Sequence, residues 1–220
     1  MGRLKLPRKS TNVDMTAMCD VAFLLLTFFI LVGQFKPAEA LSVTTPKSVS
    51  TTPTEQKDLV LVVMDQSGKI YFTVSDDASD EKRAIIEYVN ENKSLNLTDA
   101  EKMAFLRSGS YVGVPFSQLK SFLQHKPEEL KPENLPGIPV DSANNELTVW
   151  MRGTKTAFQG SKMNLVVKGD SEAKYAAFKG VINAFKAVDE LKFQLITDPE
   201  GVPPGTELYQ KQLSGAMGAK

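Results

Sequence analysis

The residue that most invites a chemical role is an aspartate placed among apolar residues. Asp20 lies within Met15–Phe35, 21 residues that otherwise consist mostly of Phe, Leu, Ile, Val, Met, Ala and Thr. A carboxyl group in such surroundings can take up and release a proton. On a helix with 100° per residue, three polar side chains fall within about 40° of Asp20. They are Thr16, Thr27 and Gln34.

This polar stripe on an apolar helix predicts a helix whose polar side faces another protein. A charged carboxylate within a membrane span costs roughly 2.5–3.5 kcal/mol on insertion scales, so it is tolerated where it faces protein or water. In an alternative interpretation, Asp20 lies at the cytoplasmic interface, where headgroup water hydrates it. That interpretation leaves the alignment of Thr27 and Gln34 to chance.

The remaining residues offer little other chemistry. The chain has one His and one Cys, which excludes a multi-histidine metal site and an intramolecular disulfide framework. Four acidic residues between 76 and 81 suggest either a cation site or a solvated helix start, and we favour the second. Lys+Arg and Asp+Glu both number 26, so overall charge gives no reason to expect nucleic acid as a partner. We expect no enzymatic activity, no metal and no cofactor.

The N-terminal part must position Asp20. Residues 1–13 form a basic tail without acidic residues, and residues 14–36 form the predicted transmembrane helix. The 21 residues of Met15–Phe35 make a helix about 30 Å long, which matches the hydrocarbon thickness of a bilayer. Basic residues before the span predict a cytoplasmic N-terminus. An alternative is a cleavable signal peptide ending at Ala38–Ala40, although the acidic residues near the span and Pro37 argue against cleavage.

Residues 37–57 form a Ser/Thr/Pro-rich linker, which we expect to be extended and semi-stiff. Its residues 41–45 are also suited to joining a sheet as a strand when a partner or a second copy is present. A folded α+β domain is predicted over residues 58–198. Residues 199–220 are predicted to form a flexible tail.

The domain is expected to hold a small mixed sheet with helices packed on one face. The β-branched run Leu59–Met64, a turn, and Lys69–Val74 predict a β-hairpin. Met163–Lys168 predicts a strand, followed by a helix that Asp170 or Ser171 caps and that extends to about residue 189. Leu191–Thr197 predicts a last strand, most simply joined to the previous one by a parallel crossover.

Residues 80–160 look like an insertion between the hairpin and that unit. A helix is expected at about 80–92, a capping box opens a second one at Thr98, and a third begins at Pro115. Glu146–Met151 predicts a strand that places Trp150 in the core. The sequence assigns this segment no function.

The residues from Asn12 to Phe29, NVDMTAMCDVAFLLLTFF, resemble the signature span of the ExbD/TolR family, single-span subunits of proton-driven inner-membrane motors. The order of elements in residues 59–74 and 162–197 is similar to the distal domain of that family. The resemblance implies that Asp20 takes part in proton transfer and that a multi-span ExbB/TolQ-like subunit supplies the pore. It also implies that the periplasmic domain forms a homodimer and passes motion to a TonB-like transducer.

The sequence therefore predicts an ExbD-like, single-pass inner-membrane subunit that couples proton-motive force to TonB-dependent outer-membrane transport. Two alternatives belong to other classes. One is a TolR-like or MotB-like envelope motor subunit that engages the cell wall. The other is a secreted or anchored periplasmic binding module in which Asp20 is incidental.

Overall fold

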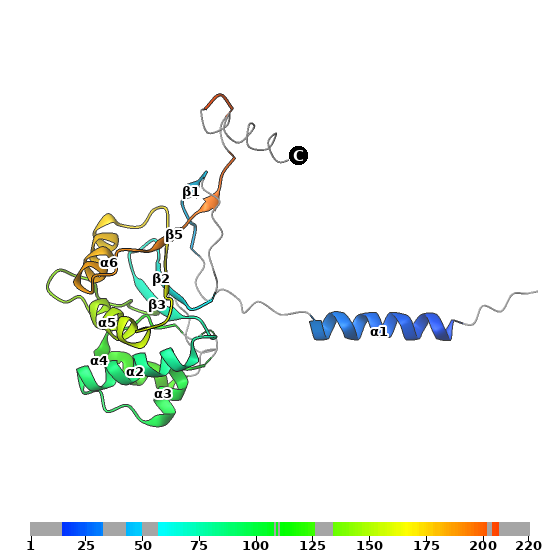
Figure 1. The fold of residues 1–220 in the computed structure, drawn as a ribbon, viewed down its shortest axis with the longest axis horizontal. Helices are drawn as coiled ribbons and strands as arrows, with labels where there is room; N and C mark the ends of the chain where they lie inside the picture. The colour runs from blue at the N-terminus through cyan, green and yellow to red at the C-terminus, as the bar shows by residue number, and fades with distance from the viewer. Residues whose placement is uncertain are drawn as a thin grey trace, which may run out of the picture. The chain divides into compact units, whose positions relative to one another are not determined.

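The computed structural model describes residues 15–32, 43–49, 57–107, 109, 111–125, 134–201 and 204–206. The chain separates into two compact units, residues 1–38 and 39–220. The first contains helix α1 (Thr16–Val32), and the second contains a mixed α+β domain (Figure 1). The prediction of an α+β domain is confirmed.

A four-stranded sheet forms the centre of the domain, in the order β3-β2-β4-β5. Its strands are β2 (Leu59–Met64), β3 (Ile70–Val74), β4 (Asn164–Gly169) and β5 (Gln194–Ile196). Strands β2 and β3 form the predicted antiparallel hairpin, and β4 is parallel to both β2 and β5. The long-range partner of β2 is therefore β4, about 100 residues further along the chain.

Helix α6 (Tyr175–Ala187) connects β4 to β5 and confirms the predicted strand–helix–strand unit. Its predicted cap is wrong. The N-cap residue is Lys174, without a side-chain cap, because four residues after Asp170 intervene before the helix begins. Asp170 instead accepts hydrogen bonds from the backbone N–H groups of Thr44 and Glu172.

The described part of the segment between the hairpin and β4 contains four helices. They are α2 (Ser79–Lys93), α3 (Asp99–Phe105), α4 (Phe116–Gln124) and α5 (Leu147–Ala157). The capping box at Thr98 is confirmed, with Thr98 and Glu101 each accepting from the other's backbone N–H. The strand predicted at Glu146–Met151 is wrong, since α5 covers most of it.

These helices supply much of the hydrophobic core. Trp150 of α5 is fully buried, and its ring lies 5.4 Å from that of Phe72 on β3. Phe105 and Phe116 stack against the same indole at 5.7 Å, so α3 and α4 meet the sheet through α5. Figure 1 shows α5 and α6 beside the strands. The segment that looked like an insertion is therefore integral to the core of the domain.

Part of the predicted linker is docked on the domain. We call residues 43–48 the strap. It contains β1 (Lys47–Ser48), which pairs in parallel with β6 (Asp198–Pro199) of the same chain. The strand therefore forms without a second copy, and a few residues later than the predicted 41–45. Figure 1 shows β1 beside the orange β6.

Candidate functional site

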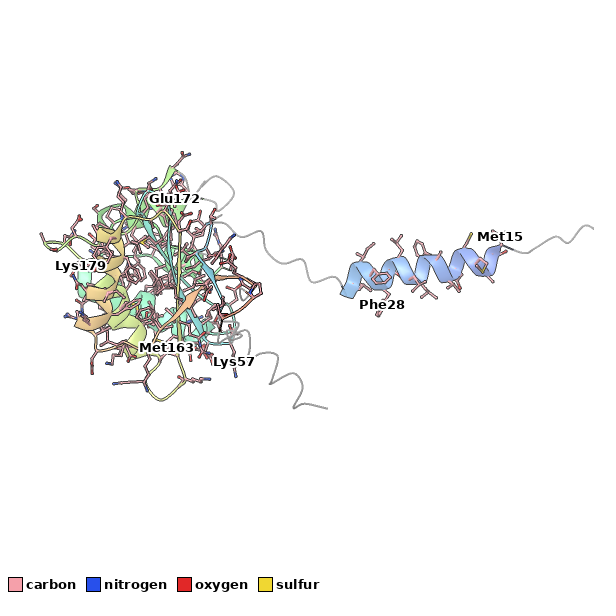
Figure 2. The ribbon with its side chains drawn as sticks, turned by 90° about the horizontal axis from the view of Figure 1, so that it is seen from above. Met15, Phe28, Lys57, Met163, Glu172 and Lys179 are labelled. Atoms are coloured by element: carbon pink, nitrogen blue, oxygen red, sulfur yellow. The ribbon has the colours of Figure 1, made fainter. Side chains whose placement is uncertain are left out.

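Helix α1 carries the predicted proton-transfer residue. Asp20 is exposed, and large apolar side chains such as Phe29 and Leu31 are exposed around the same helix. Figure 2 shows side chains projecting on all sides of α1 between Met15 and the last turn. An α-helix that is apolar all round is normally surrounded by protein or by lipid.

On the continuous helix α1, Thr16, Asp20 and Thr27 share one face, because their spacing is i−4, i and i+7. Gln34, the fourth member of the predicted stripe, lies outside the described residues. The Thr27 hydroxyl group lies 2.9 Å from each of the backbone oxygens of Phe23 and Leu24, to which it can donate. The helix itself thus satisfies this donor, and the hydroxyl oxygen keeps acceptor capacity on the Asp20 face.

Among the described residues, no helix is both long enough and apolar enough to cross a membrane; α1 has 17 residues. Residues 14 and 33–36 of the predicted span lie outside the described residues, as does the basic tail.

Two of the acidic residues after β3, Asp76 and Asp77, have structural partners. The Lys82 ammonium lies 2.6 Å from Oδ1 of Asp76 and is almost fully buried. Asp77 Oδ2 accepts a hydrogen bond from the Asp58 N–H at 2.9 Å. Hydrogen bonds from the Ser75 hydroxyl and from that N–H lower the pKa of Asp77. Within the described chain no group of three or more His, Cys, Asp or Glu side chains could hold a metal ion.

The strap is held by backbone groups at both of its ends. Thr44 donates its N–H to Asp170 at 3.1 Å and accepts from the Ser171 N–H at 2.9 Å. Further along, Pro46 and Ser48 accept from the N–H groups of Asp198 and Glu200. Thr45 between them is buried. The sequence predicted a strand in this region only at residues 41–45 and only with a partner or a second copy; the partner within the same chain, β6, was not predicted.

An apolar pocket of about 240 Å³ lies beside the strap. Pro46 of the strap, Phe178 of α6 and Leu195 of β5 line it, together with Tyr175. Tyr175 is 76% exposed and Leu195 is 46% exposed. The sequence analysis did not predict this pocket. The only sequence signal for it is a pair of apolar residues, Tyr175 at the start of α6 and Leu195 on β5, that are exposed in the structure.

The two units define a class of protein: an apolar helix that carries one carboxylate, followed in the chain by a small α+β domain. The family model described as biopolymer transport protein ExbD/TolR matches residues 7–200. The chain therefore belongs to the ExbD/TolR family. No match to it was found among the curated proteins or among the solved structures.

Membership in the family defines the coarse role of the chain, which is that of an energy-transducing subunit in biopolymer transport. Members of the family are generally membrane-associated and work in complexes with ExbB/TolQ-like partners.

Proposed function

We propose that this chain is the aspartate-bearing subunit of a proton-driven inner-membrane motor that powers TonB-dependent outer-membrane transport. In this proposal residues 14–36 span the membrane once, the N-terminus is cytoplasmic, and the domain after the linker is periplasmic. The observation that carries the proposal is one carboxylate, Asp20, on the same face as Thr16 and Thr27 of a helix whose other side chains are apolar. The family match supports it.

The proposed mechanism follows from the two charge states of a carboxyl group. When a carboxylate leaves water for a protein pore, its neutral acid becomes favoured. A proton that enters from the periplasmic side neutralises Asp20, and the helix can then turn or shift past apolar walls. Release of the proton to the cytoplasm restores the charge, which seeks the next polar contact of the pore.

The energy that the proton gradient supplies is similar to the cost of a charged carboxylate in the span. One elementary charge that crosses 100 mV releases about 2.3 kcal/mol, and a carboxylate in a span costs roughly 2.5–3.5 kcal/mol on insertion scales. The proton gradient can therefore drive a two-state change in the environment of Asp20. In the proposal, an ExbB/TolQ-like multi-span subunit forms the pore, and a homodimer of this chain passes the motion to a TonB-like transducer.

The decisive variant is Asp20→Asn, which keeps the size and polarity of the side chain but cannot release a proton. We expect it to insert in the membrane and to co-purify with its multi-span partner at the wild-type level. Proton-coupled transport should fall to the level of cells without the chain. The matched control is Asp14→Asn, the same change at a residue about 120° around a helix from Asp20, and it should retain transport. Intact transport in the Asp20→Asn chain would overturn the proposal.

The alternative role at the cell wall makes a different prediction. A TolR-like or MotB-like subunit should co-sediment, as the full chain in detergent, with purified peptidoglycan. An import subunit should instead co-purify with a TonB-like transducer. Both roles require Asp20, so the Asp20→Asn variant does not separate them, whereas these two binding measurements do.

A further inference from the structure

A second cleft, of about 440 Å³, lies along the first half of α6. Pockets that bind small molecules have volumes of roughly 300–1,000 Å³, so the cleft is large enough for a ligand. The turn of the β2–β3 hairpin contributes Ser67 and Gly68 to its lining, and the loop before α5 contributes Asp141 and Ser142. That loop belongs to residues 80–160. The cleft therefore depends on the segment to which the sequence assigns no function.

Small residues form much of the α6 side of the cleft. Ala176 and Ala177 line it, and Gly180 allows Val140 of the opposite loop to lie close to the helix. A methyl group occupies little space, so the backbone of another polypeptide can lie along this part of α6. The loop at Val140 then forms the facing wall.

Polar side chains surround these small residues. Lys174 and Lys179 line the cleft and are exposed, and among the described residues neither ammonium group has a carboxylate partner. Figure 2 shows Lys179 at the outside of the domain. The side-chain amide of Asn183 and the hydroxyl group of Ser142 likewise have no hydrogen-bond partner in the described part of the chain. Asp141 is the one acidic residue of the described lining, so two lysines and one aspartate give it a net charge of +1.

The rest of α6 strengthens this positive charge. Tyr175–Ala187 contains no Asp or Glu, whereas it contains Lys179 and Lys186 and follows directly on Lys174. A surface with charges of one sign attracts ligands of the opposite sign. The charge of the cleft therefore favours an acidic ligand.

The two lysines of the cleft are spaced to meet alternate side chains of an extended chain. Five residues along an α-helix correspond to a rise of about 7.5 Å, which separates Lys174 from Lys179 along the axis. In an extended chain, alternate side chains point the same way and lie about 6.4–6.8 Å apart. Two acidic residues with one residue between them can therefore reach both lysines. The backbone of such a segment lies over Ala176, where Asn183 can donate a hydrogen bond to it.

We propose that this cleft binds an extended acidic segment of a partner protein, with acidic residues at alternate positions. The inference goes beyond the motor function and gives residues 80–160 a role, because their loop forms the wall that holds the segment against α6. Exposed ion pairs are individually weak, so a free peptide should bind weakly. A partner that is held in the same complex binds more strongly, because its effective concentration is high.

Amide NMR of the isotope-labelled full-length chain in detergent micelles tests the site. The probe is the acetylated and amidated peptide Ser-Glu-Ser-Glu-Ser, which should shift the signals of Gly68, Ser142 and Asn183 together and saturably. Ser-Gln-Ser-Gln-Ser should shift none of them. Ser-Glu-Glu-Ser-Ser has the same charge but directs its carboxylates to opposite sides, so it should bind at least about threefold more weakly. Acetate at the same carboxylate concentration should not compete with the probe.

Substitutions in the cleft test the roles of its residues. Lys174→Gln and Lys179→Gln should each weaken binding of the probe about two- to fivefold, as expected for the loss of one exposed ion pair. The matched control is Lys186→Gln, the same change on α6 outside the cleft, and it should weaken binding less than twofold. Asp141→Asn should strengthen binding, because it removes a like charge. Ala176→Phe fills the cleft without changing its charge and should abolish binding.

Several results would overturn the proposal. If Lys186→Gln weakened binding as much as Lys179→Gln, the peptide would be bound by a diffuse basic surface instead of the cleft. If the peptide with adjacent glutamates bound as tightly as the probe, or if acetate displaced the probe, the cleft would bind anions without regard to an extended chain. Unchanged fluorescence of Trp150 in each variant shows that the domain stays folded. Asp20→Asn should leave binding of the probe unchanged, so failure of the motor proposal and failure of this one are distinguishable.

Discussion

At the scale of the residue, the most consequential buried charge of the domain is Lys82. Its side chain is almost fully buried on α2, and Asp76, which is about half exposed, lies 2.6 Å from it. Asp76 also accepts from the Gly109 N–H at 3.2 Å. The carboxylate of Asp76 thus neutralises a buried ammonium and holds the loop at Gly109.

We predict that Asp76→Asn lowers the free energy of unfolding by about 2–3 kcal/mol. Removal of one partner from a fully buried pair costs roughly 3–5 kcal/mol, and the exposure of Asp76 reduces that value. Chemical denaturation followed by Trp150 fluorescence measures the change. Asp80→Asn, an exposed carboxylate in the first turn of the same helix, should lower it by less than about 1 kcal/mol. Replacement of both partners, as Lys82→Met with Asp76→Asn, should be milder than Asp76→Asn alone.

At the scale of the element, α5 shows where local sequence reasoning fails. The strand prediction rested on Val149, Trp150 and Met151, which favour strands when they are considered alone. Over a longer window the buried residues are Leu147, Trp150, Met151 and Thr154, at the i, i+3, i+4 and i+7 spacing of a helix. Six residues span too little of that period to distinguish the two structures.

Elements whose whole sequence pattern lies within the element itself were predictable. The hairpin carried two β-branched runs around a turn, and Thr98 with Glu101 formed the capping box that the spacing indicates. The cap of α6 was not predictable, because the carboxylate of Asp170 binds Thr44, 126 residues away in the chain. For the candidate site, the shared face of Thr16, Asp20 and Thr27 follows from sequence spacing alone, whereas the pocket at Leu195 depends on tertiary contacts.

Gly180 has no side chain, and this lets α6 pack closely against the loop before α5. A Cβ atom at Gly180 would lie 2.4 Å from the carbonyl oxygen of Val140 and 2.9 Å from its Cβ. Asn145 donates to the Gly180 carbonyl at 2.8 Å, so the backbone on both sides of this contact is held in place.

We therefore predict that Gly180→Ala lowers the free energy of unfolding by about 1–3 kcal/mol, the usual cost of overpacking. Gly201→Ala is the matched control, since nothing lies within 4 Å of a Cβ atom there. Thermal unfolding of both variants measures the difference. Equal stability of the two variants would show that α6 can move away from the loop without cost.

At the scale of the whole molecule, the strap joins both ends of the folded unit. It precedes the domain in sequence, yet it is held by Asp170 and by the residues that follow β5. Because Asp170 accepts from both Thr44 and Glu172, its carboxylate connects the strap to the loop before α6.

We predict that Asp170→Ala releases the strap while the core stays folded. In the full-length chain, amide hydrogen exchange should accelerate severalfold at Thr44, Ser171 and Asp198, and it should stay unchanged in β2. Asp141→Ala, at an exposed aspartate in the loop before α5, is the control and should leave the strap protected. Faster exchange throughout the sheet would instead show that Asp170 supports the fold as a whole.

Docking of the strap also decides how many residues connect α1 to the first docked residue of the domain. With the strap in place, residues 33–42 separate α1 from the first docked residue, Val43, which packs against the core. If the strap detached, residues 33–56 would separate them, an increase of 14 residues. A fully extended chain gains at most about 3.3–3.6 Å per residue, so 14 further residues would lengthen the connecting segment by up to about 50 Å. A few backbone hydrogen bonds therefore decide whether 10 or 24 residues connect the helix that carries Asp20 to the first docked residue of the domain.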